Sequence, residues 1–288
     1  MESILEIKGL KKSFKDFSLK GIDITLEKGY IMGFIGPNGA GKTTTIKLIM
    51  NLMKKDAGVI KVFGLDNVKY ELDVKQKIGF VYDENNYYEE LTISEMKRIV
   101  ASFYKTWDDS AFNKYIGEFR LPLKKKIKDL SKGMKMKFSL AVALSHNADL
   151  LIMDEPTSGL DPLVRRELLE ILSQIIQDEN KAVFFSTHIT SDLEKIADYV
   201  TLINDGEIVL SLEKDELINN YGLVRGGKEL LNNVNSKDFI DIRENQFGFE
   251  ALVKDKNQTR KAYKDKIIIE KPSLEDVMLY YTRRCRNV

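Results

Sequence analysis

The sequence predicts an α/β core that is interrupted by a helical insertion and followed by a small α+β domain. Short β-like apolar runs fill residues 1–36, and apolar spacing becomes helical directly after a glycine-rich loop, which predicts the core. A helical pattern between residues 86 and 146 predicts the insertion, because strand signals return only after it. A length of 288 residues fits two domains, or one large domain with an appendage.

Composition is that of an ordinary soluble protein. The chain has 45 Lys and Arg against 44 Asp and Glu, a net charge of +1, and 43% hydrophobic residues. Its longest apolar run, residues 30–36, is far shorter than the roughly 18 residues that span a membrane. No secretory signal is expected, and the single cysteine, Cys285, suits the reducing cytosol. We therefore expect a cytoplasmic protein, and its net charge does not indicate any particular class of partner.

The N-terminal third begins with strands. Alternating apolar residues over 22–26 predict a half-buried strand, and the continuous run 30–35 predicts a buried one. A helix is expected from Lys42 to an exit at residues 56–58. The apolar positions on its face are Ile46, Ile49, Met50 and Met53. Strand, glycine-rich loop and helix in this order are typical of a nucleotide-binding βα unit.

Helices follow a further buried strand at residues 78–82. Thr92 and Glu95 fit a capping box at a helix start, residues 112–119 have amphipathic helical spacing, and a third helix is expected over 131–145. Strands are then expected at two segments, 150–153 and 182–185. The helix between them has Asp161 as N-cap and Pro162 at its first position.

These patterns divide the chain into three parts. Residues 1–85 and 147–214 form the nucleotide-binding core, residues 86–146 the helical subdomain, and residues 215–288 a C-terminal accessory domain. Glycine and asparagine become frequent over 219–233, and two or three weaker strands lead to a last helix.

Residues 36–43, Gly-Pro-Asn-Gly-Ala-Gly-Lys-Thr, fit the phosphate-loop pattern. Glycines let backbone amides turn toward phosphates, and the following helix start adds partial positive charge. Lys42 is expected to reach the β and γ phosphates of ATP, and Thr43 to place its hydroxyl on Mg²⁺. The predicted nucleotide-binding residues of this segment are Gly36, Pro37, Asn38, Gly39, Ala40, Gly41, Lys42, Thr43 and Thr44.

A second segment predicts the carboxylates of the same site. The apolar run 150–153 delivers Asp154 and Glu155 to the C-terminal end of a strand, where open α/β sheets bind ligands. Asp154 is expected to hold Mg²⁺ directly or through water. Glu155 is placed to polarise an attacking water, so the two segments together predict a site that binds and hydrolyses a nucleoside triphosphate.

Five further features carry a resemblance to a known family. Residues 130–134, Leu-Ser-Lys-Gly-Met, look like a signature that usually reads LSGGQ, and residues 158–161 match the D-loop. His188 ends a strand as the switch histidine does, Phe14 matches the aromatic that stacks on adenine, and Asp83 falls where the Q-loop glutamine normally lies. The chain resembles the nucleotide-binding subunits of ATP-binding cassette (ABC) transporters.

This resemblance implies a phosphate-loop, RecA-like ABC ATPase core that works as a pair. Two subunits would pack head to tail, so that Ser131 and the amide of Gly133 meet the γ phosphate held by the partner's phosphate loop. His188 would contact the γ phosphate and the water, and join Lys42 and Glu155 as catalytic residues. Asp161 would carry information between the two sites.

The resemblance also implies a membrane partner. Such subunits drive a separate integral membrane permease, which would place the chain on the inner face of the cell membrane, with no nucleic acid as a partner. Segment 270–277 resembles the tail of the subfamily that serves ABC-2 type exporters. The substrate, the permease, and the choice between a homodimer and pairing with a different cassette stay open.

Three positions depart from the family pattern. Lys132 and Met134 replace the usual glycine and glutamine of the signature, and Asp83 replaces a glutamine that touches the metal and the permease. A carboxylate at Asp83 is expected to bind Mg²⁺ more strongly or to misplace the water. Since Glu155 and His188 are both present, an active site is favoured over a degenerate one.

Two other classes are weighed against this interpretation. A soluble ABC ATPase acting on ribosomes or nucleic acid usually has two cassettes, long coiled-coil insertions or cysteine-rich cluster domains, whereas this chain has one cassette, no heptad run and one cysteine. A switch GTPase needs Asn-Lys-x-Asp, which neither Asn113-Lys114 nor Asn180-Lys181 completes. The transporter subunit is therefore favoured.

Overall fold

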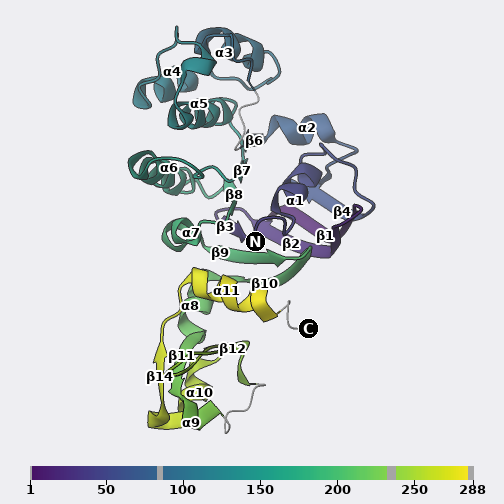
Figure 1. The fold of residues 1–288 in the computed structure, drawn as a ribbon. Helices are drawn as coiled ribbons and strands as arrows, with labels where there is room; N and C mark the ends of the chain where they lie inside the picture. Colours follow the sequence, from purple (N-terminus) through teal and green to yellow (C-terminus); the bar gives the residue numbers. More distant parts are fainter. Residues whose placement is uncertain (1, 83–86, 232–237, 285–288) are drawn as a thin grey trace.

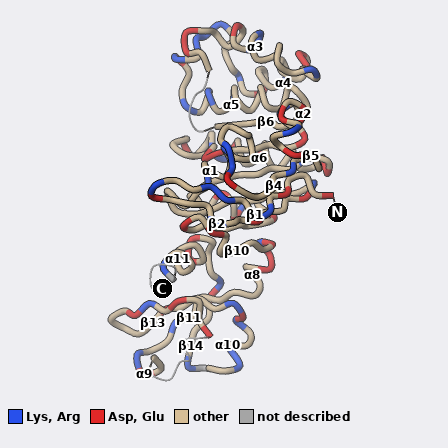
Figure 2. Tube along the Cα trace, turned by 90° about the vertical axis from the view of Figure 1, so that its right-hand side faces the viewer, with Lys and Arg blue, Asp and Glu red and all other residues tan. Residues whose placement is uncertain are grey.

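The structure is a computed structural model that describes residues 2–82, 87–231 and 238–284. Figure 1 shows an elongated arrangement, with a helical segment at one end, two sheets with their helices in the middle, and a further sheet at the other end. Figure 2 shows Lys and Arg interleaved with Asp and Glu in all three regions. The near-neutral charge is thus spread through the molecule rather than divided between a basic and an acidic part.

A six-stranded sheet forms the centre of the α/β core. Its strands, in spatial order, are β10 (Glu207–Glu213), β9 (Tyr199–Asn204), β3 (Ile31–Ile35), β8 (Ala182–Thr187), β7 (Leu150–Asp154) and β6 (Ile78–Val81). All except β10 run parallel, and every residue of β3, β7 and β8 is buried. Parallel strands buried on both faces appear in sequence as continuous apolar runs, so the predicted core strands are present. The carboxyl ends of β3, β7 and β8 meet at one edge.

A four-stranded antiparallel sheet lies beside this core. Its strands, in spatial order, are β2 (Ser18–Glu27), β1 (Ser3–Ser13), β4 (Ala57–Val62) and β5 (Leu65–Asp66). Ile22, Ile24 and Leu26 point into the hydrophobic core, as their alternation predicts. The expected helix exit at residues 56–58 instead leads directly into β4, which begins at Ala57. The short helix α2 (Glu71–Gln76) follows β5.

Helix α1 (Lys42–Ile49) ends earlier than its apolar spacing predicts. Asn51 adopts the left-handed conformation at φ 50°. The amide of Asn51 donates to Leu48 O (3.2 Å) and the amide of Leu52 to Lys47 O (2.8 Å), which together form a Schellman motif with asparagine at the usual glycine position. The expectation that Met53 continues the helical face is therefore wrong.

The helical segment is built on caps that the sequence signals. It consists of α3 (Ile93–Ala101), α4 (Asp109–Glu118), the 3₁₀ turn η1 (Ile127–Asp129) and α5 (Lys132–Leu144). Thr92 Oγ1 accepts from the Glu95 amide (3.2 Å) and Glu95 Oε2 accepts from the Thr92 amide (2.8 Å), so the predicted capping box is present. Ser131 is the N-cap of α5. Back in the core, α6 (Pro162–Ile175) starts after Asp161 as predicted.

The C-terminal part contains a third sheet, antiparallel throughout. Its strands, in spatial order, are β12 (Asp241–Glu244), β13 (Gly248–Val253), β11 (Gly222–Gly227) and β14 (Ile267–Glu270). The helical elements here are α8 (Lys214–Asn220), α9 (Lys228–Leu231), α10 (Lys256–Tyr263), the 3₁₀ turn η3 (Lys264–Lys266) and α11 (Leu274–Arg284). The described residues thus hold four strands where two or three were expected. The limits of the three domains stay a prediction.

The largest hydrophobic cluster connects these regions. It includes Phe138 in the helical segment, Phe185 on β8, and Leu274 and Tyr280 on α11, all of which are buried. Helix α11 packs on α7 (Thr190–Ile196) and also against β12 and β13. The last helix therefore folds back onto the core (Figure 1).

Candidate functional site

The phosphate loop leaves the end of β3 and enters α1 through Gly41. Gly41 has φ 115°, a conformation that L side chains rarely adopt, and it is the N-cap of α1. A Cβ on Gly36 would lie 2.2 Å from the carbonyl oxygen of Ile203 on β9. Glycine is therefore needed where the start of the loop passes close to β9. The Lys42 side chain is 6% exposed, and its Nζ donates to Gly36 O at 2.8 Å. The loop and α1 therefore hold a buried cation.

Asp154 ends β7 beside the loop. It is 3% exposed, and its Oδ1 accepts a hydrogen bond of 2.5 Å from Ser186 on β8. Burial raises the pKa of the Asp154 carboxyl, and hydrogen bonds from Ser186 and Thr43 oppose that rise. The side chains of Asp154 and Thr43 thus lie beside each other.

Glu155 bridges the two remaining candidate catalytic residues. Its Oε1 lies 3.3 Å from Lys42 Nζ, and its Oε2 lies 2.7 Å from His188 Nδ1 and accepts the His188 backbone amide at 3.2 Å. Glu155 also has φ 50°, which is uncommon for a residue with a side chain and occurs often at functional sites. The structure therefore brings Lys42, Glu155 and His188 together from three separate segments.

The phosphate loop and Glu155 line the same hollow, which has a volume of about 440 Å³. It is lined by Phe14, Phe17, Asn38, Gly39, Gly41, Lys42, Thr43, Thr44 and Glu155. Phe14 is 44% exposed, and its ring stacks on that of Phe17 with centroids 6.2 Å apart. Phe17 was not among the expected residues. The sequence signal that could have indicated Phe17 is a second aromatic residue three positions after Phe14. The tight turn formed by residues 14–17 brings the two rings together.

The signature and D-loop residues do not line this hollow. Ser131 Oγ accepts from the Met134 amide (3.2 Å), and a Cβ on Gly133 would lie 3.0 Å from Val164 on α6. Asp161 caps α6 by accepting from the Leu163 and Val164 amides at 3.1 Å. Within one chain these residues therefore form a separate surface. Asp83 lies outside the described residues.

The oxygen donors at the loop fit Mg²⁺. This cation prefers hard oxygen ligands and is usually held by one or two carboxylates together with substrate phosphates. The Thr43 hydroxyl and the Asp154 carboxylate supply such donors in contact with each other. No cluster of three or more His, Cys, Asp and Glu suited to a metal occurs in the described ranges, so phosphate oxygens would have to complete the coordination.

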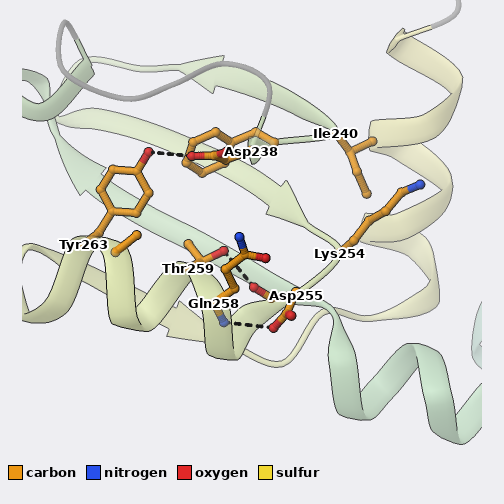
Figure 3. Close-up of a pocket in the computed structure, with 9 residues that line it drawn as sticks. Asp238, Ile240, Lys254, Asp255, Gln258, Thr259 and Tyr263 are labelled. Atoms are coloured by element: carbon orange, nitrogen blue, oxygen red, sulfur yellow. Dashed lines mark hydrogen bonds between the residues drawn. The ribbon is translucent and has the colours of Figure 1, made fainter.

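A second hollow, of about 370 Å³, lies in the C-terminal part (Figure 3). It lies between the segment 238–240 and α10, where Tyr263 donates to Asp238 and Asp255 caps the helix. None of its lining residues belongs to the phosphate loop. The second hollow is therefore separate from the phosphate loop.

Comparison with known proteins decides the family. A family profile described as "ABC transporter" matches residues 19–158. The bacitracin transport ATP-binding protein BcrA of Bacillus licheniformis is 33% identical over 75% of this chain and 72% of its own length. The chain belongs to the ABC transporter ATP-binding family. The lantibiotic transport ATP-binding protein SrtF of Streptococcus pyogenes is 34% identical over 75% of this chain and 96% of its own.

Solved structures agree with this ABC assignment. A structure described as the ATP binding subunit of an ABC transporter has a TM-score of 0.69 and 29% identity, and covers 75% of this chain and 92% of its own. The fold is shared with cbiO1 of Clostridium perfringens, at a TM-score of 0.66, 23% identity and 76% and 92% coverage. The predicted family and fold class are confirmed. The protein is the ATP-binding subunit of an ABC transporter rather than a ribosome- or nucleic-acid-acting ATPase.

Over residues 2–82, 87–231 and 238–284, every helix is too short or too polar to cross a bilayer.

Proposed function

We propose that this ABC subunit hydrolyses ATP to drive export through a separate membrane permease. The observation that carries the ATPase proposal is the Glu155 carboxylate, which lies between Lys42 and His188 beside the phosphate-loop hollow. The relatives named for bacitracin and lantibiotic transport support an antibiotic or peptide as the class of cargo.

The proposed mechanism starts from the ion pair between Lys42 and Glu155. ATP phosphates reaching Lys42 would replace Glu155 as its counter-charge, which leaves the carboxylate free to accept a proton from the attacking water. The contact with His188 Nδ1 keeps that carboxylate oriented. Mg²⁺ bound by Thr43 and Asp154 would neutralise charge on the phosphates. The protein's part is thus to position a base and a cation beside the reacting phosphate.

Adenine and the second subunit would occupy the remaining candidate residues. Phe14 presents an exposed ring at the hollow and is backed by Phe17, so it offers a face for stacking the base. Ser131 and Gly133 do not line the hollow of their own chain. We therefore propose that they act on ATP bound by a second cassette, in a homodimer or a mixed pair, with Asp161 at the junction.

An apolar face between α2 and α3 supports docking of a permease. Leu72 on α2 is 80% exposed and Phe103, just after α3, is 70% exposed. The two segments are connected, because Gln76 Nε2 donates to Phe103 O at 2.7 Å. Exposed large apolar side chains at such a junction fit a protein interface. Docking there would hold the chain peripherally on the cytoplasmic face of the membrane.

Membrane association tests this proposal. The full chain is expected to sediment with membranes when an ABC-2 type permease from the same operon is co-expressed, and to stay in the supernatant otherwise. A Leu72→Asp, Phe103→Asp double variant should still bind ATP but lose the membrane fraction. Phe247→Asp, at a side chain 89% exposed in the C-terminal part, is the matched control. Permease-independent binding to ribosomes or nucleic acid would contradict the transport role.

A second prediction concerns Asp83, proposed as part of the metal environment. Asp83→Gln removes a negative charge near Mg²⁺, so it should raise the magnesium concentration that gives half-maximal ATPase activity while changing ATP affinity less. Magnesium titrations of the two proteins, with Asp73→Asn on α2 as control, measure this. Superimposable titrations would place Asp83 outside the metal environment.

A further inference from the structure

The helix after His188 is short and is positioned by its neighbours. Helix α7 has seven residues and its N-cap, Ile189, makes no side-chain cap. An isolated helix of this length is not stable. His188 itself is 44% exposed, and its ring contacts Glu155. His188 lies between β8 and α7, so whatever holds α7 contributes to the position of this ring.

One side of α7 is held by α6. Arg165 Nε donates to Asp192 Oδ1 at 2.6 Å, and the same guanidinium donates to Ser191 Oγ at 3.0 Å. Asp192 is fully buried. Helix α6 has the D-loop residue Asp161 as its N-cap, so this ion pair connects α7 to the proposed dimer junction.

The other side of α7 is held by α11. The Leu274 amide, at the first position of α11, donates to Glu194 Oε1 at 2.7 Å. Leu274 and Val277 are buried in the same cluster as Leu193 of α7. An amide at a helix start binds a carboxylate well, because the helix dipole adds to the hydrogen bond. Glu194 thus connects the helix of the switch histidine directly to the C-terminal helix.

Helix α11 is in turn fixed to the C-terminal sheet. Tyr280 OH donates to Glu250 Oε1 on β13 at 2.9 Å, and Glu250 Oε2 accepts from Arg225 on β11 at 2.9 Å. Tyr280 is completely buried. A continuous set of contacts therefore leads from the third sheet through α11 to α7.

We propose that Glu194 is a positioning residue through which the C-terminal helix holds His188 against Glu155. The inference rests on the proposed ATPase function and adds a role for residues 274–281 in turnover. Glu194 touches neither the phosphate-loop hollow nor Glu155 in the structure described here. Its effect is therefore on the rate of hydrolysis rather than on ATP binding.

Steady-state kinetics of the full chain test this role. Glu194→Ala is expected to lower kcat by about 3-fold to 30-fold, the range for a coupling contact remote from the ligand, with KM for ATP changed less than about twofold. Glu194→Gln keeps an oxygen acceptor for the Leu274 amide and should restore kcat. Lys195→Ala, an exposed neighbour on the same helix, is the control and should match wild type.

A double-mutant cycle separates positioning from general destabilisation. In a His188→Ala background, measured under single-turnover conditions, Glu194→Ala should cause no further loss, because the group it positions is gone. An equal loss in both backgrounds, a failure of glutamine to restore kcat, or an unchanged kcat in Glu194→Ala would overturn the inference alone. A wild-type chain without ATPase activity would overturn the proposed function and this inference with it.

Discussion

Replacing Glu155 with glutamine is expected to slow ATP hydrolysis by about 10² to 10⁴, the range for a positioned general base. Glutamine keeps the length of the side chain and an oxygen that His188 can contact, but its amide cannot take a proton from water. It also removes the negative partner of Lys42, which lies 3.3 Å away. ATP should therefore still bind, and unhydrolysed ATP should hold two subunits together.

Phosphate release and size-exclusion chromatography in excess ATP and Mg²⁺ measure both effects. Glu170→Gln, at an exposed α6 residue paired with Arg166, is the matched control and should behave as wild type. If Glu155→Gln stays monomeric in excess ATP and hydrolyses it at the normal rate, Glu155 has another role.

Replacing Lys42 with alanine is expected to weaken ATP binding strongly. Lys42 is the cation buried at the base of the hollow, with 6% of its side chain exposed. A hydrogen bond to a charged group contributes ~1.5 to 3 kcal/mol, which corresponds to a loss of about 10-fold to 100-fold in affinity. Without Lys42, the Glu155 carboxylate loses its counter-charge and should repel the phosphates, which adds to the loss of affinity.

Isothermal titration calorimetry with ATP measures this prediction. Lys47→Ala on the same helix, where Lys47 Nζ lies 5.9 Å from the Tyr82 ring, controls for loss of a lysine from α1. Circular dichroism checks that both variants fold. An unchanged ATP affinity in Lys42→Ala would remove the phosphate-loop assignment, and with it the proposed function.

Features with local causes could be predicted from the amino-acid sequence. The phosphate loop, the capping box at Thr92 and the N-cap at Asp161 depend on residues within a few positions of one another, so pattern is enough to predict them. Buried parallel strands were also predictable, because a strand that is covered on both faces appears in the sequence as a continuous apolar run. The end of α1 was missed although it is local, since Asn51 occupies a position where glycine is the usual signal.

Contacts between residues far apart in the chain could not be predicted, because they depend on the fold as a whole. The roles of Lys42, Glu155 and His188 were proposed from their motifs, but the contacts of Glu155 with the other two arise because β3, β7 and β8 end at one edge of the sheet. The return of α11 to α7 had no sequence signal, since the amide of Leu274 and the carboxylate of Glu194 are far apart in the chain. Such a contact depends on the path of the whole C-terminal sheet between them, and no local pattern encodes that path.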